Sequence, residues 1–110
     1  MKKNNNKKLE QDLFKTLISI KKPELMANFL KDLCTPQELT ALAERWHVCK
    51  LLHEGNLSYR EINDLTGASL ATITRVARFL KDEPHHGYQA VLKNNSVRTL
   101  RRAQGERGKK

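Results

Sequence analysis

The stretch LSYREINDLTGASLATITR, residues 57–75, predicts two short helices joined by a tight turn. Glu61 follows Ser58 by three residues, which is the spacing of a capping box at the start of a helix. Gly67 can adopt the positive φ that often follows the last turn of a helix, and Ser69 can cap the helix that comes next. Two short helices with this turn form a helix-turn-helix, a motif that many DNA-binding proteins use.

The second of these helices has an apolar side and a side of small and basic residues. The apolar side, which we expect to be buried, consists of Leu70, Ile73, Val76, Ala77 and Leu80. The other side has no aspartate or glutamate before Asp82, which favours a DNA groove over an ordinary corner of two amphipathic helices. The residues from which we expect DNA contacts are Tyr59, Arg60, Asn63, Leu70, Ala71, Thr72, Thr74 and Lys81. Those before Leu70 and Lys81 should meet the DNA backbone or groove edge, and the others the bases, partly through bridging water.

Both ends of the sequence are strongly basic, and together they account for the net charge of +9. The first eight residues carry four lysines and no acid, and the last sixteen carry six basic residues against Glu106 alone. Residues 9–94 are therefore neutral overall. Polar ends of this kind bury too little apolar surface to fold, so we expect disordered basic tails at 1–8 and 95–110. Such tails either attract nucleic acid or only keep the protein soluble.

Helical periodicity extends through residues 9–94, where no alternating strand pattern occurs. Thr35 and Glu38 have the spacing of a second capping box, with a proline between them at the first helical position. His85 and His86 should form the first turn of a last helix opened by Pro84. The helices outside the helix-turn-helix are expected at 9–20, ended by Pro23, and at 25–33, 36–54 and 84–94. The sequence thus predicts one all-α domain of about six short helices.

The first two predicted helices carry more apolar residues than one small bundle can cover, so we expect a homodimer. A dimer would place two recognition helices about one turn of DNA apart. The sequence has neither an apolar run long enough for a membrane span nor a signal-peptide core, so we expect a cytoplasmic protein without membrane contact. Cys34 and Cys49 should then be reduced thiols rather than a disulfide.

Three short motifs resemble the tryptophan operon repressor family. They are ATITR at 71–75 behind Gly67-Ala68, the Thr35-Pro36 helix start, and EGNLS at 54–58. The resemblance covers roughly residues 9–94, and DLCT at 32–35 and GAS at 67–69 are closer to the tryptophan-repressor-like branch of uncharacterised bacterial regulators. It implies an intertwined, all-helical homodimer that binds double-stranded DNA as a repressor.

The resemblance also implies a ligand pocket. Tryptophan-binding members hold the indole between two arginines, which Arg45 and Arg75 match, and Thr35 matches a further pocket position. Val76 and Phe79 stand where those members have glycine and serine, so we expect their bulk to fill the slot. L-tryptophan is therefore not expected as a corepressor.

The two matching arginines have other interpretations. They would form surface salt bridges if Glu38 or Glu44 lay within reach. They would also suit a pocket for a different small acid, although the sequence does not identify such an effector.

The sequence lacks a phosphate-binding glycine loop, a catalytic triad order and a paired-carboxylate signature, so no enzyme is expected. His53, His85 and His86 with Cys49 lack the closely spaced cysteine pairs typical of zinc sites, so no metal is expected either. The sequence predicts a sequence-specific, dimeric transcriptional regulator. The alternative is a protein-interaction module of the transcription machinery that attracts nucleic acid only through its basic tails.

Overall fold

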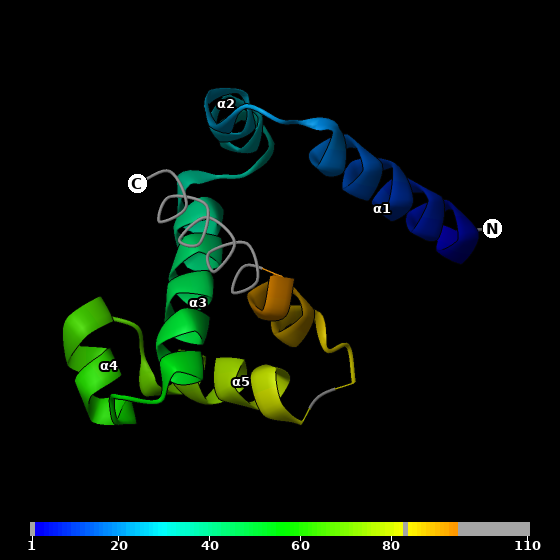
Figure 1. Cartoon of the computed structure of the whole chain (residues 1–110). Coiled ribbons are helices and arrows are strands. Elements are labelled where there is room, and N and C mark those ends of the chain that lie inside the picture. Colours follow the sequence, from blue (N-terminus) through cyan, green and yellow to red (C-terminus); the bar gives the residue numbers. More distant parts are fainter. Residues whose placement is uncertain (1, 83, 95–110) are drawn as a thin grey trace, which may run out of the picture. The chain divides into compact units, whose positions relative to one another are not determined.

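The computed structural model describes residues 2–82 and 84–94, which are helical with short connections (Figure 1). The helices are α1 (Lys2–Ser19), α2 (Pro23–Leu33), α3 (Pro36–Glu54), α4 (Tyr59–Thr66) and α5 (Leu70–Lys81). A further helical segment covers residues 87–94. The described ranges contain no strand, so the prediction of an all-α fold with six helices is confirmed. The predicted C-terminal tail, residues 95–110, lies outside the described residues.

The chain forms two compact units, Met1–Thr40 and Ala41–Lys110. The first contains α1, α2 and the first turn of α3. The prediction of a disordered tail at 1–8 is wrong for residues 2–8, which belong to α1. Lysine is a good helix former, and extending a helix costs much less than nucleating one, so the apolar stripe of α1 supports a helix that starts earlier. None of the described side chains of this unit is buried.

Prolines and a capping box set the helix starts in the first unit. Pro23 is the first residue of α2, a position where its missing N–H is not needed, and α1 has already ended at Ser19. At the start of α3, the Thr35 hydroxyl accepts a hydrogen bond from the N–H of Glu38 at 3.1 Å. The Glu38 carboxylate accepts one from the N–H of Thr35 at 2.8 Å, which completes the predicted capping box.

The second unit has a small apolar core. The end of α3 meets α4 and α5 there (Figure 1). The buried core residues are Val48, Cys49, Ile62, Ala68, Ile73, Val76, Leu80 and Leu92. Each of α3, α4, α5 and the segment 87–94 thus contributes to one cluster. Because α4 has only eight residues, it depends on this packing for its stability.

The helix-turn-helix forms as predicted from its capping residues. The Ser58 hydroxyl accepts from the N–H of Glu61 at 3.1 Å, and the Glu61 carboxylate accepts from the N–H of Ser58 at 2.9 Å. Gly67 ends α4 with a φ of 78°, a left-handed conformation that glycine adopts without strain. Ser69 caps α5 by accepting from the N–H of Thr72 at 3.1 Å. These local hydrogen bonds hold the three-residue turn.

Two details of the sequence prediction are wrong. Leu70 is 57% exposed, whereas the other four residues of the predicted apolar side of α5 are buried. Leu70 is the first residue of the helix, so no preceding turn covers it. The last helical segment begins at residue 87 rather than at Pro84, because His86 has a φ of 56°, outside the helical range. His85 and His86 therefore belong to a turn.

Candidate DNA-binding surface and effector pocket

Helix α5 presents a face of small and basic side chains that the core leaves uncovered. Ala71, Thr74 and Lys81 are exposed, as is Leu70. Thr72 is half-buried, and its side-chain oxygen accepts a hydrogen bond from the Ser69 hydroxyl at 3.0 Å. No acidic residue occurs between Leu70 and Lys81. This face can therefore approach a polyanion without like-charge repulsion from its own helix.

The three residues predicted to contact DNA from α4 do not behave alike. Tyr59 and Arg60 are exposed in the first turn of the helix. Asn63 is half-buried, and its side-chain amide donates to the carbonyl oxygen of Ala68 at 2.7 Å. That bond joins the end of α4 to the turn before α5, so Asn63 stabilises the turn. Asparagine commonly bonds turn backbone in this way, which is a signal that the sequence interpretation did not use.

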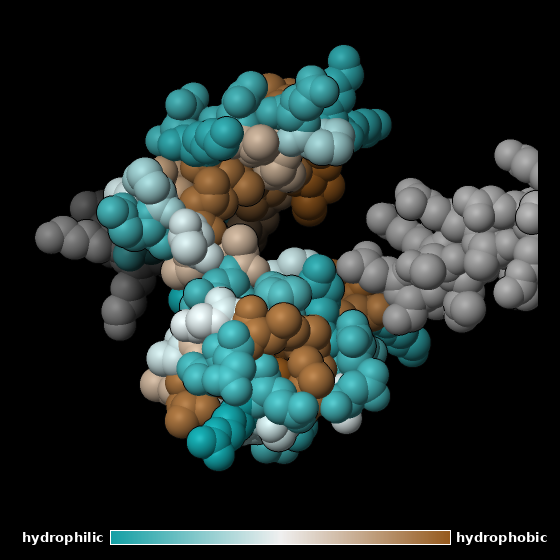
Figure 2. Space-filling model, turned by 90° about the vertical axis from the view of Figure 1, so that its left-hand side faces the viewer, coloured by the Kyte–Doolittle hydropathy of each residue, from teal (hydrophilic) through white to brown (hydrophobic). Residues whose placement is uncertain are grey.

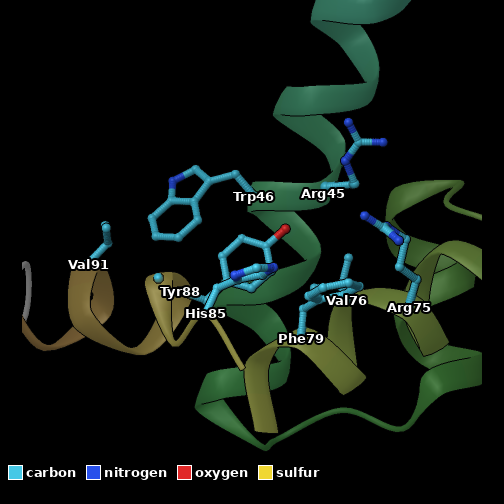
Figure 3. Close-up of a pocket in the computed structure, with 9 residues that line it drawn as sticks. Arg45, Trp46, Arg75, Val76, Phe79, His85, Tyr88 and Val91 are labelled. Carbon is cyan, nitrogen blue, oxygen red and sulfur yellow. The ribbon is translucent and has the colours of Figure 1, made fainter. Parts of the chain in front are cut away.

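A hollow of about 780 Å³ lies in the second unit between α3, α5 and the segment 87–94. Its lining residues are Arg45, Trp46, Arg75, Val76, Phe79, His85, Gly87, Tyr88 and Val91. Figure 3 shows the two arginines toward one end of this group, and Trp46 and Val91 toward the other. The lining includes no carboxylate side chain. Its chemistry is therefore cationic at one end and aromatic over most of the remaining wall.

Four of the five residues predicted for the effector pocket line this hollow together. Val76 is fully buried and Phe79 is half-buried, so Val76 belongs to the floor while the Phe79 ring remains partly accessible. The Arg75 guanidinium carbon lies 4.4 Å from the centre of the Phe79 ring, within the range of a cation–π contact. Among the described residues, neither Arg45 nor Arg75 has a carboxylate partner, and Glu38 bonds Thr35. The structure thus gives no support to the salt-bridge interpretation.

Thr35, the fifth predicted pocket residue, belongs to the first unit, where its side chain caps α3. Sequence reasoning missed the aromatic wall of the hollow. Trp46 and Tyr88 have ring centres 6.4 Å apart, and His85 stacks on Phe79 with ring centres 6.2 Å apart and an interplanar angle of 3°. These pairs join residues that are not close in helical register, so no sequence periodicity could have indicated them.

The described residues give no sign of catalytic or metal chemistry. Burial raises the pKa of the Cys49 thiol to about 11, so this thiol is protonated and unreactive near neutral pH. No group of three or more metal-ligating side chains occurs among the described residues. Within the same residues, no helix combines the length and the apolar composition that crossing a membrane requires.

The capped helix pair, the acid-free face of α5 and the adjacent cationic hollow define a helix-turn-helix protein. The sequence profile described as Trp repressor protein matches residues 7–96. The chain therefore belongs to the Trp repressor family, whose members are DNA-binding regulators of transcription and not enzymes.

Individual relatives agree with this assignment. The chain is 47% identical over 74 residues to the uncharacterized protein YerC of Bacillus subtilis, covering 67% of this chain and 69% of that protein. It is 44% identical over 54 residues to a Trp operon repressor homolog of Aliivibrio salmonicida, covering 49% of this chain and 50% of that protein. The crystal structure of a TrpR-like protein from Eubacterium eligens matches with a TM-score of 0.72 and 36% identity, covering 78% of this chain and 87% of that one.

Proposed function

We propose that the chain is a sequence-specific transcriptional repressor that acts on cytoplasmic DNA as a homodimer. The observation that carries this proposal is the exposed, acid-free face of α5, held in place by the capped turn between α4 and α5. A rigid helix that presents such a face fits the major groove, which is wide enough to admit one helix.

The DNA contacts that we propose follow from exposure and side-chain length. Leu70, Ala71 and Thr74 are short or apolar and face outward, so they suit methyl and water-mediated contacts with base edges, together with Thr72. Tyr59 and Arg60 at the start of α4 and Lys81 at the end of α5 suit phosphate groups. Phosphate contacts of this kind position the helix, whereas the base contacts determine which sequence binds.

The homodimer is proposed because the first unit has exposed apolar side chains and no buried ones. On α1, Leu9 is 67% exposed, Phe14 54% and Ile18 79%. On α2, Leu25 is 54% exposed and none of its residues is buried. Figure 2 shows apolar side chains, in brown, at the surface. Helices with so much uncovered apolar area need a partner surface, and a second copy of the chain supplies one with two-fold symmetry.

Selection of bound fragments from random duplex DNA tests specificity and dimerisation together. We expect an enriched sequence made of two inverted half-sites with centres about one helical turn apart, because a two-fold dimer presents two copies of α5. Half-sites at this spacing should also require both copies in a footprint. Enrichment of no sequence at all would contradict specific recognition and favour the protein-interaction module instead. Enrichment of a single half-site would contradict the dimer.

We also propose that DNA binding does not require L-tryptophan. The proposal rests on Phe79, whose ring stands in the hollow and stacks with the guanidinium of Arg75. An arginine already stacked on an aromatic ring of its own chain is less available to an added indole. Arg45 has no carboxylate partner among the described residues, so a different small anion remains compatible with the hollow.

Calorimetric titration with L-tryptophan should therefore give no binding heat, and the affinity for the selected DNA should stay the same when L-tryptophan is added. Forcing an indole into a filled site costs about 1–3 kcal/mol for each overpacked contact, enough to remove useful affinity. The double variant Val76→Gly with Phe79→Ser is the comparison, because it empties the hollow. Saturable binding of L-tryptophan by the unmodified chain would show that the slot is open.

A further inference from the structure

Three flat side chains link the recognition helix to the turn that follows it (Figure 3). Arg75 and Phe79 are four residues apart on α5, which places them on one face of the helix. His85 comes from the turn after α5, and its ring is parallel to the Phe79 ring within 3°. Phe79 is the member common to both contacts, so its ring joins α5 to a separate segment of backbone.

The backbone around this stack is constrained from the other side as well. The Gln89 side chain donates a hydrogen bond to the carbonyl oxygen of Leu80 near the end of α5. The N–H of Ala90 bonds the carbonyl oxygen of His86, which begins the helical segment 87–94. Leu80 and Leu92 both belong to the buried core. The turn is therefore held at its two ends by hydrogen bonds and the core, and in its middle by His85 against Phe79.

His86 gives a reason why the stack matters for this turn. Its φ of 56° is uncommon for a residue with a side chain, although histidine adopts it more readily than most. A conformation of this kind persists when surrounding contacts determine it. The His85 ring on Phe79 is such a contact, because it lies immediately before the strained residue.

We propose that Phe79 is a positioning residue for DNA binding. Its ring holds His85 and Arg75 and so keeps the second half of α5 in the orientation that the DNA groove needs. This inference rests on the proposed function. It assigns to a side chain of the chain itself the task of ordering the recognition helix beside an otherwise open hollow.

The test compares Phe79→Ala with Phe79→Tyr in the full chain, using the selected DNA site and an unrelated duplex. Phe79→Ala should weaken binding to the selected site by roughly tenfold or more, as expected for the loss of one ring stack and one cation–π contact. Binding to the unrelated duplex should change less than twofold, because electrostatic binding does not need an ordered α5. Phe79→Tyr keeps the ring and should restore the affinity for the selected site.

Val91→Ala is the matched control, because Val91 also lines the hollow, is 47% exposed and has no part in the stack. It should leave both affinities unchanged. If Phe79→Ala does not fold, His85→Ala decides the matter, because His85 is exposed and its loss should weaken only the selected site. Equal affinity of Phe79→Ala and the unmodified chain for the selected site overturns the positioning role while leaving the proposed function intact. A failure of the unmodified chain to select any site would instead overturn the proposed function.

Discussion

Replacing Ala71 by glutamate should abolish specific DNA binding. Ala71 is exposed near the start of α5, on a face without any acidic residue. A carboxylate there would meet the phosphates and the acceptor-rich edges of the bases, and a like charge at an interface costs several kcal/mol. We expect the affinity for the selected site to fall by at least about 100-fold. Fluorescence anisotropy titration of labelled DNA measures this loss directly.

The matched control for that change is Ala90→Glu. Ala90 is also exposed and helical, but it lies in the segment 87–94 rather than in the recognition helix. The two variants have the same net charge, so a purely electrostatic loss would be equal in both. We expect Ala90→Glu to keep most of the affinity at moderate salt. Equal losses in the two variants, both of them folded by circular dichroism, would contradict the placement of α5 in the groove.

Truncating Ile62 to alanine should have the largest effect on stability. Ile62 is fully buried and is the member of α4 that enters the core. Removing its side chain leaves a cavity under a helix of only eight residues, which has little stability of its own. We expect the free energy of unfolding to fall by about 2–5 kcal/mol. Denaturation by guanidinium, followed by circular dichroism, provides the measurement.

Leu65→Ala on the same helix is the control for Ile62→Ala. Leu65 is 64% exposed, so its truncation removes little buried area, and alanine is the better helix former. The change in stability should stay within about 0.5 kcal/mol, as for most surface substitutions. A loss at Leu65 as large as that at Ile62 would mean that Leu65 is covered in the native assembly. The core described for the single chain would then be incomplete.

The helix boundaries that could be predicted from the sequence are those set by local hydrogen bonds. Ser58 with Glu61, Thr35 with Glu38, and Gly67 each act within a few residues, so their spacing already contains the geometry. For the same reason the helix-turn-helix and the end of α3 were predicted correctly. The helical residues 2–8 were missed because charge composition describes an isolated segment, whereas here the segment continues an apolar helix.

The candidate site was predictable only in part. Arg45, Arg75, Val76 and Phe79 could be grouped because the family resemblance relates positions that are far apart in the chain. The stacking of His85 on Phe79 depends on a left-handed residue in the turn, and such a conformation at a residue other than glycine has no dependable sequence signal. Asn63 was assigned to DNA because it lies near the exposed end of α4, whereas its amide bonds the backbone of the turn.

The thiol of Cys49 has a consequence for the conditions under which such a regulator can work. It lies in the core with no exposed area, and its pKa of about 11 leaves it almost entirely protonated at neutral pH. Peroxides and disulfides react with thiolates that they can reach, so the folded molecule offers them neither the charge nor the access at this position. Oxidative stress would therefore act on Cys49 only in molecules that have transiently opened, and a stable fold is what protects this residue from oxidation.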